Sequence, residues 1–183
     1  MTQTEILLNI IDIFNKHKIE YMITGSFASN LHGVPRATFD TDIVIKADET
    51  SLAKFTKEVS KEFYVEEKTG ATALGQSEMF NIVHYDTGFK IDLIPIKHRS
   101  YSEIEFSRCQ PIDFAGRKCW FSSPEDAILS KLEWAKIGAS EKQFSDALGI
   151  VKVQRDKLDW EYLHKWAKEL SVVDLLDKIS RSL

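Results

Sequence analysis

Residues 24–46 read TGSFASNLHGVPRATFDTDIVIK, and this stretch decides the fold. Gly25-Ser26 lies near its start. Asp40 and Asp42, separated by one residue, lie near its end, just before an apolar run. On a strand, residues two apart point to the same face, so the two carboxylates lie side by side and repel each other. A charge at the edge of a core costs free energy unless it has a partner. A divalent cation is such a partner, and oxygen ligands of this kind suit Mg²⁺ or Mn²⁺.

The Gly-Ser pair lies between two predicted elements. EYMIT (20–24) is typical of a short buried strand, and FASNLHG (27–33) indicates a short helix that follows a tight turn. A glycine lets the backbone approach a phosphate closely, and the start of a helix offers free N–H groups. We therefore expect Gly25 and Ser26 to grip a phosphate group, with the Ser26 hydroxyl as an additional donor.

A third acid, Asp92, lies in the run FKIDLIPI (89–96), which is otherwise typical of a core strand. A charge inside such a run needs an explanation. If this strand lies beside DTDIVIK (40–46), three carboxylates converge. They can then hold two metal ions about 4 Å apart, as two-metal phosphoryl-transfer sites require.

Outward from this stretch, the chain alternates helices and strands up to about residue 122. Apolar residues at helical spacing predict an N-terminal helix, and FYVEE (63–67) indicates another short strand. MFNIVHYD and FKIDLIPI, joined by a short turn, predict a hairpin, and QPIDFAGRKCWF (110–121) repeats that pattern. We expect an α/β (α+β) core over residues 1–122.

From Ser123 the pattern changes to helices. Ser123 can cap a helix, Pro124 suits its first position, and Asp126 follows three residues after the cap. Apolar residues at helical spacing continue to the end of the chain and predict three or four helices. We expect residues 123–183 to form a C-terminal helical segment packed on the core.

Composition limits the function classes. The chain has 183 residues, 43% of them hydrophobic and 28% charged, which is ordinary for a folded domain. Its net charge of −4 argues against coating nucleic acid through a broad basic face. One local stretch is basic and would matter beside a phosphate site, although a solvated mixed-charge surface is the simpler interpretation. Its residues are Lys97, His98, Arg99, Arg108, Arg117 and Lys118.

No targeting or membrane signal is visible. The N-terminus lacks a basic start and a small-residue cleavage site, and no stretch has the roughly 18 apolar residues that a membrane span needs. We therefore expect a cytoplasmic protein without a membrane partner. Cys109 and Cys119 are accordingly expected to be reduced thiols.

The order of these motifs resembles a known fold. A Gly-Ser pair, a short helix, Asp-x-Asp entering a strand and a later strand with a third Asp are similar to the nucleotidyltransferase fold of the DNA polymerase beta superfamily. The longer string, His32-Gly33, Arg36, Thr38 and Asp40-Thr41-Asp42, resembles the AbiEii-type toxin and minimal nucleotidyltransferase branches. The resemblance implies a mixed β-sheet flanked by helices, an NTP substrate, transfer of a nucleoside monophosphate, and two Mg²⁺ ions.

The C-terminal part adds to the resemblance. SPEDAILSKLEWA followed by Asp146 is similar to the helical segment that carries a lysine and an aspartate in AbiEii-type proteins. By that resemblance Lys131 and Asp146 are candidate site residues. AbiEii-type segments usually carry an arginine between the two, whereas this interval offers only Lys136 and Lys142.

The candidate residues fall into roles. We expect Asp92 to activate the acceptor hydroxyl, and Lys131 to stabilise charge developing on the phosphates. Arg36 either balances phosphate or pairs with an acid, and the sequence leaves both open. The predicted catalytic residues are Asp40, Asp42, Asp92 and Lys131, the metal ligands are the same three aspartates, and the nucleotide-binding residues are Gly25, Ser26, Arg36 and Asp146.

Several functional alternatives remain open from the sequence. The acceptor is an RNA such as a tRNA end, a protein hydroxyl, or a small molecule such as an aminoglycoside. The AbiEii resemblance implies a toxin of a toxin–antitoxin pair, with an antitoxin as partner. An alternative from another class is a catalytically silent module that binds nucleotide or protein.

Overall fold

The computed structural model describes residues 1–65 and 78–182. They form two compact units, Met1–Ile23 with Phe39–Phe121, and Thr24–Thr38 with Ser122–Leu183. The predicted domain boundary between residues 122 and 123 stays a prediction. The compact units differ from it because they place Thr24–Thr38 with the C-terminal helices.

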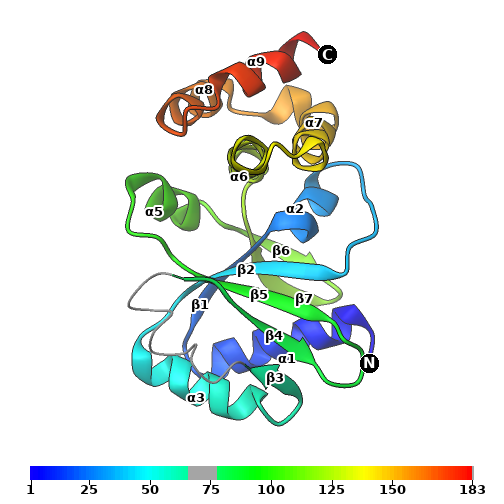
Figure 1. Cartoon of the computed structure of the whole chain (residues 1–183), viewed down its shortest axis with the longest axis vertical. Helices are drawn as coiled ribbons and strands as arrows, with labels where there is room; N and C mark the ends of the chain where they lie inside the picture. The colour runs from blue at the N-terminus through cyan, green and yellow to red at the C-terminus, as the bar shows by residue number, and fades with distance from the viewer. Residues whose placement is uncertain (66–77, 183) are drawn as a thin grey trace. The chain divides into compact units, whose positions relative to one another are not determined.

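The first unit is built on a mixed sheet, which confirms the predicted fold class (Figure 1). Its strand order in the described residues is β3-β4-β5-β2-β1-β7-β6. The β2–β5 and β1–β7 pairs are parallel, and the β3–β4, β4–β5 and β6–β7 pairs are antiparallel. The strands are β1 (Glu20–Thr24), β2 (Asp40–Lys46), β3 (Phe63–Val65), β4 (Phe80–His84), β5 (Lys90–Pro95), β6 (Gln110–Phe114) and β7 (Arg117–Phe121).

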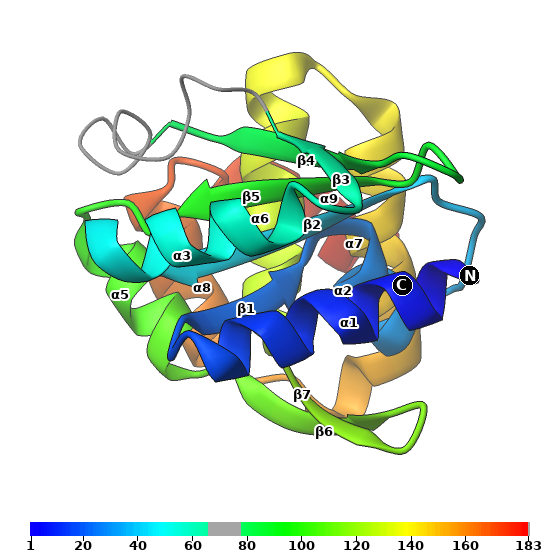
Figure 2. The ribbon, with the colours of Figure 1, turned by 90° about the horizontal axis from the view of Figure 1, so that it is seen from below.

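Helices α1 (Gln3–Lys16) and α3 (Glu49–Val59) cover one face of this sheet (Figure 2). Their apolar stripes meet, because the rings of Phe14 and Phe55 stack with centroids 4.8 Å apart. Both helices begin at capping side chains: Thr2 accepts from the backbone N–H of the third helical residue of α1, and Asp48 does the same in α3. The strand residues facing these helices form the core of the first unit.

Both predicted hairpins are confirmed. The β6–β7 turn places Ala115 and Gly116 at φ of 52° and 79°, the left-handed conformations that a tight two-residue turn needs. The predicted strand FYVEE corresponds to β3, and its last two residues lie outside the described residues. Helix α5 (Ser100–Ser107) was not predicted, because two of its buried positions are polar, Ser102 and Glu105, and so no apolar stripe marks it in the sequence.

The second unit consists of helices, which confirms the predicted C-terminal helical segment. Ser123 caps α6 by accepting from the Asp126 N–H, as its sequence indicates. Gly33, after α2, lies so close to α7 that an added Cβ would come within 2.7 Å of the Ile150 nitrogen. The helices are α2 (Gly25–His32), α6 (Pro124–Gly138), α7 (Glu141–Gln154), α8 (Trp160–Glu169) and α9 (Val173–Arg181), with a 3₁₀ turn η1 (Arg155–Lys157) before α8.

Two buried polar side chains of the second unit, those of His32 and Asp126, have hydrogen-bond partners within it. The His32 ring nitrogen Nε2 lies 2.8 Å from the Ser122 carbonyl oxygen. Asp126, fully buried on α6, accepts a 2.6 Å hydrogen bond from the Tyr162 hydroxyl on α8. These bonds satisfy groups whose burial would otherwise destabilise the unit.

The two cysteines are not bonded to each other. Burial raises the pKa of both the Cys109 and the Cys119 thiol, which makes each a weaker nucleophile than an exposed thiol. Within residues 1–65 and 78–182, no helix is both long and apolar enough to cross a bilayer.

Candidate functional site

The parallel pairing of β2 and β5 places the three predicted aspartates on one face of the sheet. Asp42 lies opposite Asp92 in the register, and Asp40 lies opposite Lys90. Residues paired in this way, and residues two apart on either strand, point to the same side. The alternate residues of β2, such as Thr41 and Ile43, are fully buried on the other side.

Asp92 is the most buried of the three carboxylates, with a side chain 6% exposed. Its Oδ2 atom lies 2.7 Å from the Lys90 ammonium nitrogen. Its Oδ1 atom is buried and has no hydrogen-bond partner among the described residues. An unpartnered carboxylate oxygen is costly to bury, and a cation is a ligand that would satisfy it.

The carboxylates do not close around one point. Across residues 1–65 and 78–182, no three His, Cys, Asp or Glu side chains are gathered as a metal-binding group. Lys90 contributes to this arrangement, since its ammonium is held at Asp92. The hydrogen bond to Asp92 raises the pKa of Lys90, and the negative charges of Asp92, Asp40 and Asp42 add to the rise against the opposing effect of burial. The oxygen-rich donor set and the unpartnered Asp92 oxygen nevertheless fit a hard divalent cation.

The second unit joins four of the predicted residues in one hydrogen-bonded network. The Arg36 guanidinium donates through Nε and Nη2 to the two oxygens of Asp146, at 2.8 and 2.7 Å. Lys131 Nζ lies 2.9 Å from Asp146 Oδ2. Arg36 Nη2 also donates to the Ser26 hydroxyl at 3.0 Å. We call Arg36, Lys131, Asp146 and Ser26 the basic network.

The basic network carries one more positive than negative charge. Burial by itself would raise the pKa of Asp146, but hydrogen bonds from Arg36 and Lys131 outweigh it and hold that pKa below its ordinary value. Asp146 is therefore ionised at neutral pH and balances one of the two cations. Lys131, whose side chain is 5% exposed, is fixed in position by this pair. The remaining positive charge suits an anion.

Helix α2 begins at Gly25, next to the basic network in the chain. Gly25 has a φ of 62°, a conformation that glycine adopts without strain. In the described part of the chain, no side chain caps this helix, and the buried Thr24 hydroxyl oxygen has no hydrogen-bond partner. Uncapped N–H groups and a free hydroxyl are donors that a phosphate accepts from.

Comparison with solved structures identifies the fold. The solution structure of the antibiotic-resistance factor ANT(2'')-Ia superposes with a TM-score of 0.65, at 16% identity, over 99% of this chain and 98% of that one. A putative nucleotidyltransferase from Thermotoga maritima superposes with a TM-score of 0.55, at 19% identity, over 78% of this chain and 92% of that one. The chain has the nucleotidyltransferase fold.

A third solved structure superposes on this chain over nearly the whole of its own length. The lincosamide antibiotic adenylyltransferase LnuA, solved with lincomycin bound, superposes with a TM-score of 0.56, at 17% identity, over 84% of this chain and 98% of that one. No family model matches the sequence. No curated protein matches it either. The AbiEii-type branch within the nucleotidyltransferase fold stays a prediction.

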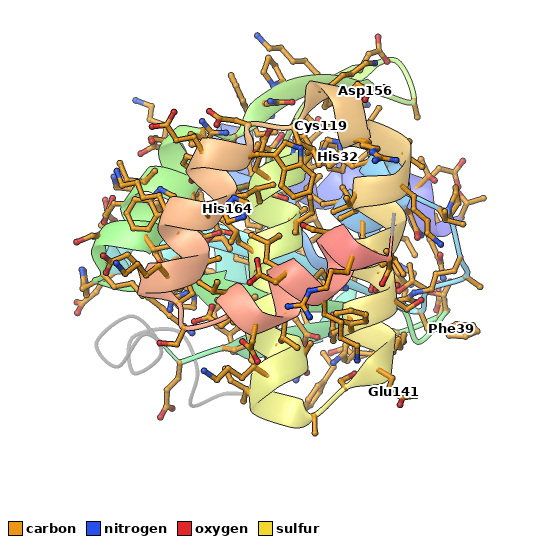
Figure 3. All side chains as sticks on the ribbon, turned by 90° about the horizontal axis from the view of Figure 1, so that it is seen from above. His32, Phe39, Cys119, Glu141, Asp156 and His164 are labelled. Carbon is orange, nitrogen blue, oxygen red and sulfur yellow. The ribbon has the colours of Figure 1, made fainter. Side chains whose placement is uncertain are left out.

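Sequence reasoning missed Lys90 as a member of the aspartate face of this nucleotidyltransferase fold. The signal was present, because Lys90 precedes Asp92 by two residues and strand alternation puts both on one side. It also missed Phe39, which directly precedes Asp40. Phe39 is 82% exposed as a residue, and its side chain projects away from the ribbon (Figure 3). An exposed aromatic ring at this position is a candidate for contact with a planar ligand.

Three residues of the basic stretch have partners in the structure. Arg117 on β7 forms an ion pair with Asp12 on α1. Arg99 donates through Nε to the Ser102 hydroxyl at 2.9 Å, and Lys118 Nζ lies 5.0 Å from the centre of the Trp120 ring. Of these three partners, only Asp12 is an acid that balances the positive charge.

One cavity of the second unit is separate from all the predicted residues. It has a volume of about 710 Å³ and lies among η1, α8 and α9. Its walls mix both signs of charge with one tryptophan, and Asp156 and His164 are labelled in Figure 3. The lining residues are Arg155, Asp156, Leu158, Trp160, His164, Asp177, Ser180 and Arg181.

Proposed function

We propose that this chain is a divalent-metal-dependent nucleotidyltransferase that moves a nucleoside monophosphate from an NTP to an acceptor hydroxyl. The observation that carries the proposal is the register Asp42 opposite Asp92, with Asp40 on the same face and one Asp92 oxygen buried without a partner among the described residues. The nucleotidyltransferase fold supports it, because Asp40, Asp42 and Asp92 are the acids that the sequence resemblance selects.

In the proposed reaction, Asp40, Asp42 and Asp92 hold two Mg²⁺ or Mn²⁺ ions. When bound, such ions lower the pKa of an attacking hydroxyl and neutralise phosphate charge. The acceptor oxygen forms a bond to the α-phosphorus, and the bond from that phosphorus to the bridging oxygen of the β-phosphate breaks. Asp92 accepts the hydroxyl proton, and pyrophosphate leaves with the bridging oxygen. Asp92 suits this role because its Oδ1 accepts no hydrogen bond from the described residues.

The triphosphate is proposed to bind the start of α2 and the basic network. Gly25 allows close backbone approach, and the Ser26 hydroxyl adds a donor. Lys131 and Arg36 supply positive charge where negative charge develops on the leaving phosphates. Asp146 orients both cations through hydrogen bonds of 2.7 to 2.9 Å. Both roles considered for Arg36 are then combined, since it pairs with an acid and faces phosphate.

We propose a small molecule as the acceptor, and ATP as the first donor to test. The support is the structural likeness to ANT(2'')-Ia, solved in complex with adenylyl-2''-tobramycin, over 93% of this chain and 98% of that one. The net charge of −4 favours a cationic acceptor over RNA.

The test uses purified wild type and Asp42→Asn with each of four α-³²P-labelled NTPs and Mg²⁺. Separate reactions contain aminoglycosides, a lincosamide, total tRNA and cell-extract protein. Labelled small-molecule product that requires Asp42 supports the proposal, and labelled tRNA or protein moves the acceptor to that class. Nucleotide binding without any labelled product supports the silent binding module. Equal Mg²⁺-NTP affinity of wild type and Asp42→Ala overturns the proposed site.

The AbiEii-type resemblance supports a second proposal, a cytoplasmic toxin with a cognate antitoxin. The observation that favours it is the string from His32 to Asp42 in the sequence. Induced expression of the wild type would then arrest growth, and Asp42→Asn would not. Normal growth with the wild type at the same protein level overturns the toxin role without affecting the enzyme proposal.

A further inference from the structure

Four charged side chains form a two-by-two array on the aspartate face. Asp40 lies opposite Lys90, and Asp42 lies opposite Asp92. Three of the four are acids, so the single lysine decides how much negative charge the face presents. The charges of Asp92, Asp40 and Asp42 all act on the Lys90 ammonium.

The two carboxylate oxygens of Asp92 have different environments, because only one of them contacts Lys90. Its ammonium nitrogen lies 2.7 Å from Oδ2, whereas Oδ1 is buried with no partner in the described part of the chain. The Lys90 side chain is 41% exposed and the Asp92 side chain only 6%. The carboxylate is therefore fixed, and the lysine has room to move on its flexible stem.

We propose that Lys90 takes the place of a cation at Asp92 while no nucleotide is bound, and is a positioning residue for the metal site. The inference rests on the proposed function. An ammonium at this distance repels a divalent ion that approaches Asp92. An incoming triphosphate attracts the exposed ammonium and leaves Asp92 to the metal. Metal binding at Asp92 then follows nucleotide binding, and by linkage each strengthens the other.

The test measures Mn²⁺ binding without nucleotide, by electron paramagnetic resonance of the free ion in about 0.15 M salt, where the screening length is about 8 Å. Lys90→Gln removes the charge and keeps a hydrogen-bond donor, and Lys90→Met keeps the chain length without the charge. We expect both to bind Mn²⁺ at least about tenfold more tightly than wild type, because one repelling charge is gone. Lys90→Arg keeps the charge and should stay within about twofold of wild type.

Lys46→Gln is the matched control. Lys46 lies on β2 four residues beyond Asp42, roughly 13 Å along the strand, so the same change of net charge occurs farther away than the screening length. We expect its Mn²⁺ affinity to stay within about twofold of wild type. Circular dichroism and thermal melting of every variant check the fold.

Two results overturn the inference. One is a Mn²⁺ affinity of Lys90→Gln and Lys90→Met equal to or weaker than that of wild type, and the other is an equal gain in Lys46→Gln. A parallel titration of Mn²⁺-ATP against wild type and Asp42→Asn separates the two proposals. If Asp42→Asn loses that binding and the Lys90 variants gain nothing, the inference fails alone. If Asp42→Asn binds as wild type does, the proposed function fails.

Discussion

The aspartate face of the first unit and the basic network of the second differ in how their charges are satisfied. On the aspartate face, three acids share one side of two strands, and one Asp92 oxygen has no partner among the described residues. In the basic network, Asp146 accepts three hydrogen bonds from Arg36 and Lys131. The first cluster has three acids and one lysine and so an excess of negative charge, whereas the second has two cations and one acid and so an excess of positive charge.

Because of this difference, we expect the stability of the protein to respond in opposite ways when an acid is neutralised in one cluster or in the other. Removing one acid from the aspartate face relieves repulsion between like charges, so folding does not suffer. Removing the acid from the basic network leaves a buried ammonium without its counter-charge, which is strongly destabilising. We therefore expect loss of an acid from the aspartate face to leave stability intact, and loss of the acid from the basic network to lower it; the experiments below start from this difference.

The largest effect is expected for Asp42→Asn on nucleotidyl transfer. We expect the rate to fall by about a thousandfold or more, because a lost metal ligand removes stabilisation of the transition state. The melting temperature should be unchanged or higher. Asp86→Asn, in the exposed β4–β5 turn, makes the same charge change and should alter neither quantity. A clear drop in melting temperature for Asp42→Asn would break the comparison.

Asp146→Asn tests the expectation that loss of the acid from the basic network lowers stability. We expect the free energy of unfolding to fall by about 3 kcal/mol, since Lys131 keeps its charge at 5% exposure without an ionised partner. Urea denaturation followed by circular dichroism measures it. Asp156→Asn, at an exposed position of η1, should change stability by less than about 0.5 kcal/mol. Equal losses in the two variants would contradict the assignment of Asp146 as a buried counter-charge.

Ser26→Ala tests the proposed role of the basic network in nucleotide binding. We expect the Kd for Mg²⁺-NTP to rise about tenfold, because one hydrogen bond to a charged phosphate is lost. Ser29→Ala on the same helix is the control, since the Ser29 hydroxyl donates to the Ser26 carbonyl. Isothermal titration calorimetry compares them. If Ser29→Ala weakens nucleotide binding equally, the effect comes from a change in helix α2 and not from loss of the Ser26 hydroxyl.

The smallest effect concerns pH and His32. Burial lowers the pKa of His32, and the Ser122 carbonyl and the Glu125 charge oppose this only partly. Below the ordinary pKa of about 6.5, the unfolded chain therefore binds more protons than the folded one, and stability falls as pH decreases. The melting temperature should drop between pH 7.5 and 5.5 in wild type, and less in His32→Gln. Identical drops in both proteins would exclude His32 as the cause.

Much of the fold was predictable because local signals agree with it. The caps at Asp48 and Ser123, and the apolar stripes of the helices, mark boundaries without knowledge of tertiary structure. The pairing of the β2 and β5 strands was an inference from one charged residue, Asp92, inside an apolar strand. From the sequence that pairing was only a condition, and the register with Asp42 opposite Asp92 comes from the structure.

The rest of the site depends on contacts that no local pattern records. Arg36 and Asp146 are 110 residues apart, so their ion pair appears only once the second unit is folded. Lys90 was visible through strand alternation, but a lysine at the first residue of a strand is ordinary and does not by itself indicate a site. Helix α5 buries Ser102 and Glu105, so its sequence lacks the apolar period that identifies a helix.

The register of β2 and β5 also determines whether a misfolded chain is stable. A slip of β5 by one residue along β2 would set Ile91 or Leu93 opposite Asp42 and turn the Asp92 carboxylate into the apolar layer beneath α1 and α3. Such a molecule would bury an unpaired charge and lose core packing at once. A chain with this register error is therefore also unstable, and proteolysis would remove it from the population.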